Sequence, residues 1–195
     1  MRIIGLCGRS GSGKSSLCEV ARELGFEVID CDKVYREIVS TRTPCLDELE
    51  TYFGHDVVEN DSLNRKKLAH IVFSDSEKLK KLNEITHKHI INEVNSIISA
   101  LPNDACVILD APTLFESGAD KICDCVICVI ASDEACISRI IERDGITREQ
   151  AAARLSNQPT NDFLISACDE YVVNDSTLEA LCEASYALLM KVKKV

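Results

Sequence analysis

The feature that most constrains the fold lies near the N-terminus, where the apolar run Arg2–Cys7 enters the sequence GRSGSGKS at residues 8–15. A helical pattern follows from Lys14 to Leu24, so a strand, a glycine-rich turn and a helix succeed one another, as in a phosphate-binding loop. In such a loop the glycines let backbone N–H groups turn toward a phosphate, and the positive end of the helix faces the same anion. Lys14 can reach the β- and γ-phosphates, and the Ser15 hydroxyl can ligate Mg²⁺. We therefore predict a site for a nucleoside triphosphate with Mg²⁺; the alternative is a glycine-rich turn that binds no ligand.

Apolar runs that alternate with helical patterns predict the rest of the architecture. Further strands are expected at Glu27–Ile29, Ala105–Leu109, Val126–Ile130 and Tyr171–Val173. Continuous apolar strands separated by helices indicate a parallel sheet covered on both faces. We predict an α/β protein of the P-loop NTPase fold, with a doubly wound, five-stranded parallel sheet.

Helical periodicity predicts how this single domain is organised. Residues about 44 to 100 are expected to be mostly helical and to form an acceptor-binding insertion, between core segments of about 1–43 and 101–195. A helical, arginine-bearing lid is expected at about 137–163, and Asn174-Asp175-Ser176 is expected to cap a final helix.

Composition excludes several classes of function. The formal charge of −10 and a pI near 4.9 argue against a non-specific nucleic-acid binder. No apolar run approaches the roughly 20 residues of a membrane span, and the N-terminus lacks the cleavage region of a signal peptide, so we expect a cytoplasmic protein. The 11 cysteines are therefore expected to be reduced thiols, and those at 123–128 to belong to a buried strand rather than a metal cage.

Acidic residues at two strand ends are candidates for the chemistry. Asp110 ends the third apolar run, where a carboxylate can hold Mg²⁺ directly or through water. Asp30 and Asp32 close the second strand, which we expect beside the phosphate-binding loop, and one of them would serve as base for an acceptor hydroxyl. The alternative for this pair is helix capping.

Four arginines within sixteen residues are candidates for a lid over the phosphates: Arg139, Arg143, Arg148 and Arg154. Arg139 and Arg143 share one face of a helix, and guanidinium groups suit phosphoryl oxygens on which charge develops. The alternative is a solvated face paired with Glu142, Asp144 and Glu149.

Six segments together are similar to one known family. They are Ile4–Gly8 with Lys14-Ser15, Val28–Lys33 with Arg36, Leu63–Leu68 with Val72-Phe73, Asp110–Glu116, Arg143–Gly145, and Tyr171–Asn174. On these segments, and over nearly its whole length, the chain resembles the dephospho-CoA kinase family. The D-x-D after the second strand, joined to D-x-P-x-L-F-E, is far more specific than the P-loop alone.

The resemblance implies ATP-dependent phosphorylation of the ribose 3′-hydroxyl of dephospho-CoA, by a Mg²⁺-dependent monomer or small homo-oligomer. It implies catalytic roles for Lys14, Asp32 as base or orienter, and Arg139. The implied ATP contacts are Gly8, Ser10, Gly11, Ser12, Gly13, Lys14, Ser15, Ser16, Arg139, Arg143 and, near adenine, Asn174. The implied acceptor contacts are Asp32, Arg36, Arg65, Phe73, His87, Asp110, Leu114 and Glu116.

Three positions depart from the family pattern. Cys7 stands where Thr is usual, and Lys88 follows His87 where the family has Pro. After Gln158 the family commonly offers a basic residue, which residues 159–163 lack, so a lid contact is expected to be missing and turnover to be slower by about ten- to a hundredfold. The alternatives left open are a P-loop kinase for another nucleoside-like or sugar acceptor, and a nucleotide-binding regulator that has lost catalysis.

Overall fold

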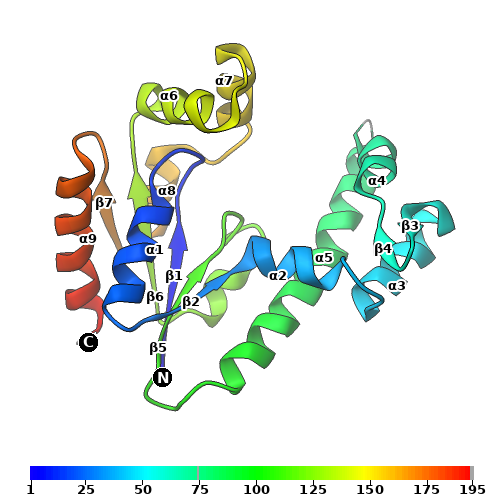
Figure 1. Ribbon diagram of the computed structural model, residues 1–195, viewed down its shortest axis with the longest axis horizontal. Coiled ribbons are helices and arrows are strands. Elements are labelled where there is room, and N and C mark those ends of the chain that lie inside the picture. Colours follow the sequence, from blue (N-terminus) through cyan, green and yellow to red (C-terminus); the bar gives the residue numbers. More distant parts are fainter. Residues whose placement is uncertain (74, 194–195) are drawn as a thin grey trace. The chain divides into compact units, whose positions relative to one another are not determined.

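The computed structural model describes residues 1–73 and 75–193 (Figure 1). The chain divides into two compact units. Met1–Ile29 and Pro102–Val195 form one, here called the core unit, and Asp30–Leu101 forms the other, here called the insert unit. None of the helices built from the described residues is long and apolar enough to cross a membrane.

A five-stranded parallel sheet organises the core unit, which confirms the predicted fold class. Its order is β2-β5-β1-β6-β7, so β1 is central. The strands are β1 (Arg2–Cys7), β2 (Glu27–Asp30), β5 (Cys106–Asp110), β6 (Cys125–Ile130) and β7 (Glu170–Val173). The parallel register places Leu6 opposite Asp110 on β5 and Cys7 opposite Cys128 on β6. The carboxyl ends of these three strands therefore meet at one edge.

The prediction that the second strand ends beside the phosphate-binding loop is wrong, because the second strand is not the neighbour of β1 in the sheet. The neighbour of β1 on that side is β5, and β2 lies beyond it. The acid that ends the adjacent strand is therefore Asp110, opposite Leu6. Strand order depends on which crossover brings a strand back to the sheet, and sequence order alone does not state it.

Two helices cover one face of the sheet and form its main hydrophobic core. Helices α1 (Lys14–Glu23) and α9 (Leu178–Lys193) lie side by side in Figure 1 and contact each other. Buried side chains of the strands, such as Ile4 and Ile127, pack between them and the sheet. The segment around the short 3-10 helix η2 (Ala119–Ile122) contacts β1, and α8 (Asn161–Ala167) contacts β6.

A small satellite core holds two further helices together. Helices α6 (Asp133–Asp144) and α7 (Arg148–Ser156) are joined by a tight turn at Gly145 and pack through Ile140 and Leu155. Thr147 and Gln150 form a capping box at the start of α7, which satisfies backbone donors there. Helices α6 and α7 occupy most of the segment that we expect to form a lid, 137–163; α8, which begins at the Thr160 cap, was not predicted.

The insert unit is mostly helical, and it also contains a short strand pair that the helical periodicity over 44–100 did not indicate. Its elements are α2 (Cys31–Ile38), α3 (Pro44–Phe53), η1 (His55–Val57), β3 (Val58–Glu59), β4 (Ser62–Leu63), α4 (Arg65–Val72) and α5 (Ser76–Ser99). Strands β3 and β4 form an antiparallel hairpin. Asn60 and Asp61 turn it with φ of 51° and 57°, and Asn and Asp are the residues that favour this left-handed pair.

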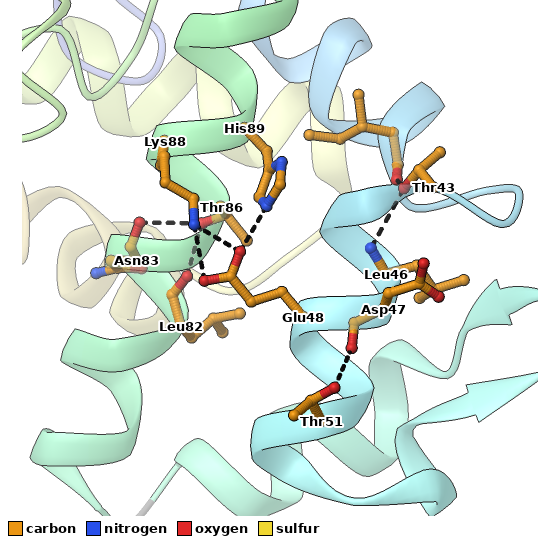
Figure 2. Close-up of polar contacts among 11 residues, drawn as sticks. Thr43, Leu46, Asp47, Glu48, Thr51, Leu82, Asn83, Thr86, Lys88 and His89 are labelled. Atoms are coloured by element: carbon orange, nitrogen blue, oxygen red, sulfur yellow. Dashed lines mark hydrogen bonds and ion pairs between the residues drawn. The ribbon is translucent and has the colours of Figure 1, made fainter.

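Lys88, one of the departures from the family pattern, lies inside the continuous helix α5. Figure 2 shows its side chain and that of His89 directed at Glu48 on α3. Lys88 Nζ donates to both carboxylate oxygens, at 2.8 and 2.6 Å, and His89 Nε2 lies 2.7 Å from Glu48 Oε2. The hydrogen bonds from Lys88 and then His89 lower the pKa of Glu48 below its usual value. These contacts join α3 to α5.

The predicted cap of the final helix is also wrong. Thr177 Oγ1 accepts from Ala180 N at 3.3 Å at the start of α9. Asp175 instead accepts from the backbone N–H of Ser132 at 2.7 Å, and Asn174 turns toward the loop after β1. The side chains of Asn174 and Asp175 could cap a helix, but they form hydrogen bonds with residues far away in the sequence instead.

Candidate active site

The loop between β1 and α1 packs too closely for a side chain at Gly11 and at Gly13. Gly11 has φ +77°, and a Cβ there would lie 2.6 Å from the carbonyl oxygen of Cys136. Gly13 has φ +106°, and a Cβ there would lie 2.3 Å from Asn174 Nδ2. Both the left-handed backbone and the lack of space therefore require glycine.

Arg139 and Asn174 hold the carbonyl groups of this loop. Asn174 Nδ2 donates to Ser12 O at 2.7 Å, and the Asn174 side chain is 6% exposed, so this hydrogen bond is shielded from water. Arg139 donates to Gly11 O at 3.2 Å and to Asn174 O and Oδ1 at 3.0 and 3.3 Å. In a trans peptide the C=O and the following N–H point in opposite directions. Fixing the Ser12 carbonyl toward Asn174 therefore turns the Gly13 N–H the other way.

A second set of contacts ties the same loop to α6 and α7. Arg9, 7% exposed, forms an ion pair with Asp133, and its Nη2 donates to Leu155 O at 3.0 Å. The Ser10 N–H donates to Gln158 Oε1 at 2.9 Å. Sequence reasoning missed these contacts, because each joins residues more than 120 positions apart.

The cationic end of the site is formed by Lys14 and the first turn of α1. Lys14 Nζ donates to Gly8 O at 2.9 Å, so the ammonium folds over the start of the loop. Gly13 precedes α1 as its N-cap and has no side chain with which to cap it, while Ser15 and Ser16 lie in the first turn. Helix N-terminal N–H groups, the helix dipole and an ammonium are the groups that suit a polyphosphate.

Asp110 supplies the carboxylate at this edge of the sheet. Its Oδ2 accepts from the Cys18 thiol at 3.7 Å. Burial, with the nearby Asp110 charge, raises the pKa of Cys18 to about 12, so the thiol stays protonated and donates to the carboxylate. Asp110 and Ser15 both offer hard oxygen donors, which fit Mg²⁺.

Three of the four candidate lid arginines are paired with acids. Arg143 donates to Asp144, and its Nη2 lies 3.5 Å from Ser10 Oγ; Arg154 pairs with the same Asp144. Arg148 pairs with Glu134 through two hydrogen bonds. Asp144 was among the acids expected as partners of these arginines, whereas Glu134 was not. Arg139 differs, because it donates to Gly11 O in the loop and to Asn174 rather than to an acid.

One pocket, of about 120 Å³, opens at the start of the loop. It is lined by Cys7, Gly8, Arg9, Pro112, Thr113, Phe115, Glu116, Asn157, Gln158, Pro159 and Leu164. Glu116 is the candidate acceptor residue on its wall, whereas Leu114 is fully buried, next to Gly5. Phe115 and Phe163 meet edge to face at 5.7 Å.

The remaining candidate residues belong to the insert unit. Asp30 caps α2 by accepting from Lys33 N at 2.9 Å, and Arg36 approaches its carboxylate at 3.9 Å. Asp30 is thus a capping acid, whereas Asp32 lies in the first turn of α2 with an exposed side chain.

Other insert-unit candidates lie on α4, α5 and the turn between them. The Arg65 guanidinium stacks over Tyr35, 5.6 Å from the ring centre, and Tyr35 had not been singled out from the sequence. Phe73 is 93% exposed, and His87 lies half-buried on α5. An arginine on an aromatic face and an exposed phenyl ring can both contact an adenine or other flat group.

A phosphate-binding loop at the carboxyl end of the central strand of a parallel α/β sheet defines a P-loop nucleotide-binding protein. Comparison with known proteins identifies the family to which this chain belongs. The sequence model of the dephospho-CoA kinase family matches residues 2–180. The chain belongs to the dephospho-CoA kinase family, whose members are phosphotransferases with an alcohol acceptor.

Individual relatives agree with this assignment. The dephospho-CoA kinase of Fusobacterium nucleatum is 41% identical over 180 residues, 92% of each chain, and that of Listeria innocua is 36% identical over 183 residues, 91% and 90%. A dephospho-CoA kinase structure from Campylobacter jejuni aligns with a TM-score of 0.74, at 25% identity, over 100% and 98% of the chains. A Bacteroides thetaiotaomicron shikimate kinase, at 14% identity and a TM-score of 0.55 over 100% and 99%, shares the fold alone.

Proposed function

We propose that this protein transfers the γ-phosphoryl group of ATP to the ribose 3′-hydroxyl of dephospho-CoA, giving coenzyme A and ADP. The observation that carries the proposal is the phosphate-binding loop, held from its carbonyl side by Arg139 and Asn174, in a chain of this family. We further propose that it acts in the cytoplasm, as a monomer or small homo-oligomer, without nucleic-acid or membrane partners.

In the proposed mechanism the core unit binds the nucleotide and stabilises the charge that develops during transfer. The N–H groups of the loop and of the first turn of α1 hold the phosphates, and Lys14 leaves Gly8 O for the β- and γ-oxygens. The Ser15 hydroxyl and the Asp110 carboxylate would hold Mg²⁺, which neutralises charge on the phosphate oxygens when bound. Because the transition state is loose, positioning and charge stabilisation account for most of the catalysis.

The insert unit would supply the acceptor side of the reaction. Asp32 would accept a hydrogen bond from the 3′-hydroxyl and take its proton as the oxygen attacks phosphorus. Its exposed position at the start of α2 leaves the carboxylate accessible to a ligand. The guanidinium groups of Arg36 and Arg65 suit the anionic diphosphate of the acceptor. Phe73 and His87 would contact its other groups.

The experiment is a phosphotransfer assay with purified protein, Mg²⁺, ATP and dephospho-CoA. Removing a general base typically costs 10²- to 10⁴-fold in rate, so Asp32→Asn is expected to lower kcat by at least about a hundredfold and to leave ATP affinity unchanged. Asp30→Asn is the matched control, since an Asn side chain also accepts from Lys33 N and caps α2. It should keep kcat within a fewfold.

Two outcomes would contradict parts of the proposal. Normal turnover by Asp32→Asn would remove the role of Asp32 as base. ATP binding by the wild-type protein without consumption of dephospho-CoA would favour a regulator that has lost catalysis. Faster transfer to another nucleoside or sugar in competition would favour a different acceptor.

A further inference from the structure

Gln158 lies where the loop after β1, the end of α7 and the 112–116 segment meet. Its side chain lines the pocket of about 120 Å³ and reaches the loop through the hydrogen bond from Ser10 N, 2.9 Å long. Nothing in the sequence pattern of the phosphate-binding loop assigns this residue a role. Its position raises the question of what the rest of the carboxamide does.

The hydrogen bond to Ser10 fixes which way the carboxamide points. A backbone N–H can only donate, so the side-chain atom that faces Ser10 must be the acceptor Oε1 and not the Nε2 amide. The two Nε2 donors therefore lie on the other branch of the carboxamide. Since Gln158 borders the pocket, these donors are available to an acceptor bound there.

The same pocket begins at the part of the loop where the phosphate-binding ammonium lies. Gly8 lines the pocket, and Lys14 Nζ donates to Gly8 O at 2.9 Å. Lysine at this position of the motif pairs with the β- and γ-phosphates, so the terminal phosphoryl group is expected on the Gly8 side of the loop. Apolar walls formed by Phe115, Pro159 and Leu164 limit water around it and strengthen any hydrogen bond formed there.

We propose that Gln158 is a catalytic residue that acts on the transferring phosphoryl group. Its Oε1 stays on the Ser10 N–H and orients the side chain, while Nε2 donates a hydrogen bond to an oxygen of the γ-phosphoryl group as negative charge spreads over it. This inference rests on the proposed function for the identity of the donor ATP, but it does not depend on which alcohol accepts the group.

The test is Gln158→Glu, which keeps an oxygen acceptor for Ser10 N and replaces the Nε2 donors by a carboxylate. A hydrogen bond to a charged group is lost and a like charge is placed beside the phosphoryl oxygens, so kcat should fall about 10- to 100-fold or more. ADP has no γ-phosphoryl group, and its affinity should stay within about twofold. The Kd ratio of ADP to ATP should therefore fall, because only ATP binding is weakened.

Gln150→Glu, in the first turn of α7, is the matched control. Gln150 Oε1 also accepts a backbone hydrogen bond, from Thr147 N at 3.0 Å, but at the other end of α7 in the capping box. Glu serves equally well in a capping box, so this variant adds the same single negative charge at a residue that does not line the pocket. It should leave kcat and both nucleotide affinities unchanged. Gln158→Met, which removes the Nε2 donors together with the Oε1 acceptor of the Ser10 N–H and adds no charge, should lower kcat by about tenfold or more.

The inference is overturned if Gln158→Glu and Gln158→Met both turn over at the wild-type rate. It is also overturned if ADP and ATP affinities fall together, because Gln158 would then only hold the loop in shape. A wild-type protein that does not phosphorylate dephospho-CoA would refute the proposed function and not this inference. In that case the role of Gln158 is decided by nucleotide binding alone. The ratio of the ADP Kd to the ATP Kd, compared between Gln158→Glu and the wild type, needs no acceptor substrate.

Discussion

Replacing Asn174 by Asp tests whether the loop is held in its binding shape from the carbonyl side. The variant is isosteric and keeps Oδ1 as an acceptor for Arg139. It loses the Nδ2 donor to Ser12 O. A carboxylate oxygen then faces the Ser12 carbonyl oxygen at the position where the wild type has a hydrogen bond of 2.7 Å. The Ser12 carbonyl is then left without its partner at a side chain that is 6% exposed.

A buried acceptor left without its hydrogen bond costs about 1–3 kcal/mol. If that free energy is needed to hold the loop in the form that fits a phosphate, the population of this form falls, and the apparent Kd rises by the same factor. About 1–3 kcal/mol corresponds to about 5- to 150-fold. A stronger, charge-assisted bond from Arg139 to the new carboxylate offsets part of the loss, so we expect about a tenfold rise.

The assay is calorimetric titration with ATP and, separately, with tripolyphosphate, which has no adenine. A role in shaping the loop predicts that Asn174→Asp weakens both ligands by a similar factor. A direct contact to adenine, which the resemblance to the family implies, predicts that ATP alone is weakened. Denaturant unfolding of the free protein reports the stability lost in each variant.

Asn161→Asp is the control for stability. Asn161 Nδ2 also donates to a backbone carbonyl, Ala131 O at 2.8 Å, but that carbonyl lies outside the loop. This variant should lose stability like Asn174→Asp and keep its affinity for tripolyphosphate. The reasoning fails if both variants weaken tripolyphosphate binding equally, or if Asn174→Asp binds it as the wild type does.

Two further predictions concern α6–α7 and the insert unit. Hydrogen bonds from Arg143 and then Arg154 lower the pKa of Asp144 to about 2, so its contribution to stability is present above its unfolded-state pKa near 4 and is lost as the pH falls from about 4 to about 2. The difference in urea midpoint between the wild type and Asp144→Asn should shrink over that range, and a difference that is constant from pH 6 to pH 2 contradicts this prediction. Lys88→Pro should cost about 3 kcal/mol or more, because proline removes a helical hydrogen bond in the middle of α5. Lys88→Ala, which removes only the ion pair with Glu48, should cost less than about 1 kcal/mol, and equal unfolding free energies for the two variants would refute the helix argument.

The local sequence pattern was sufficient to predict the fold class, and the resemblance to the dephospho-CoA kinase family was sufficient to predict the family. The strand, loop and helix of residues 2–23 are contiguous, so their order alone indicates the phosphate-binding loop. The five strands were located to within a few residues, because buried parallel strands are continuous apolar runs. The hairpin at 58–63 was missed, since two-residue strands are too short to show a period.

Contacts between distant residues were decided by the tertiary structure. Asn174 looked like a helix cap from its neighbours in sequence, but its amide is used by Ser12, 162 positions away. Gln158 meets Ser10 across 148 positions, and no local rule connects them. A side chain takes the partner that folding brings within hydrogen-bond distance, and strand order determines which partner that is. The sequence by itself therefore determined that a phosphate-binding loop forms at the end of β1, whereas only the tertiary structure decided which side chains hold and complete it.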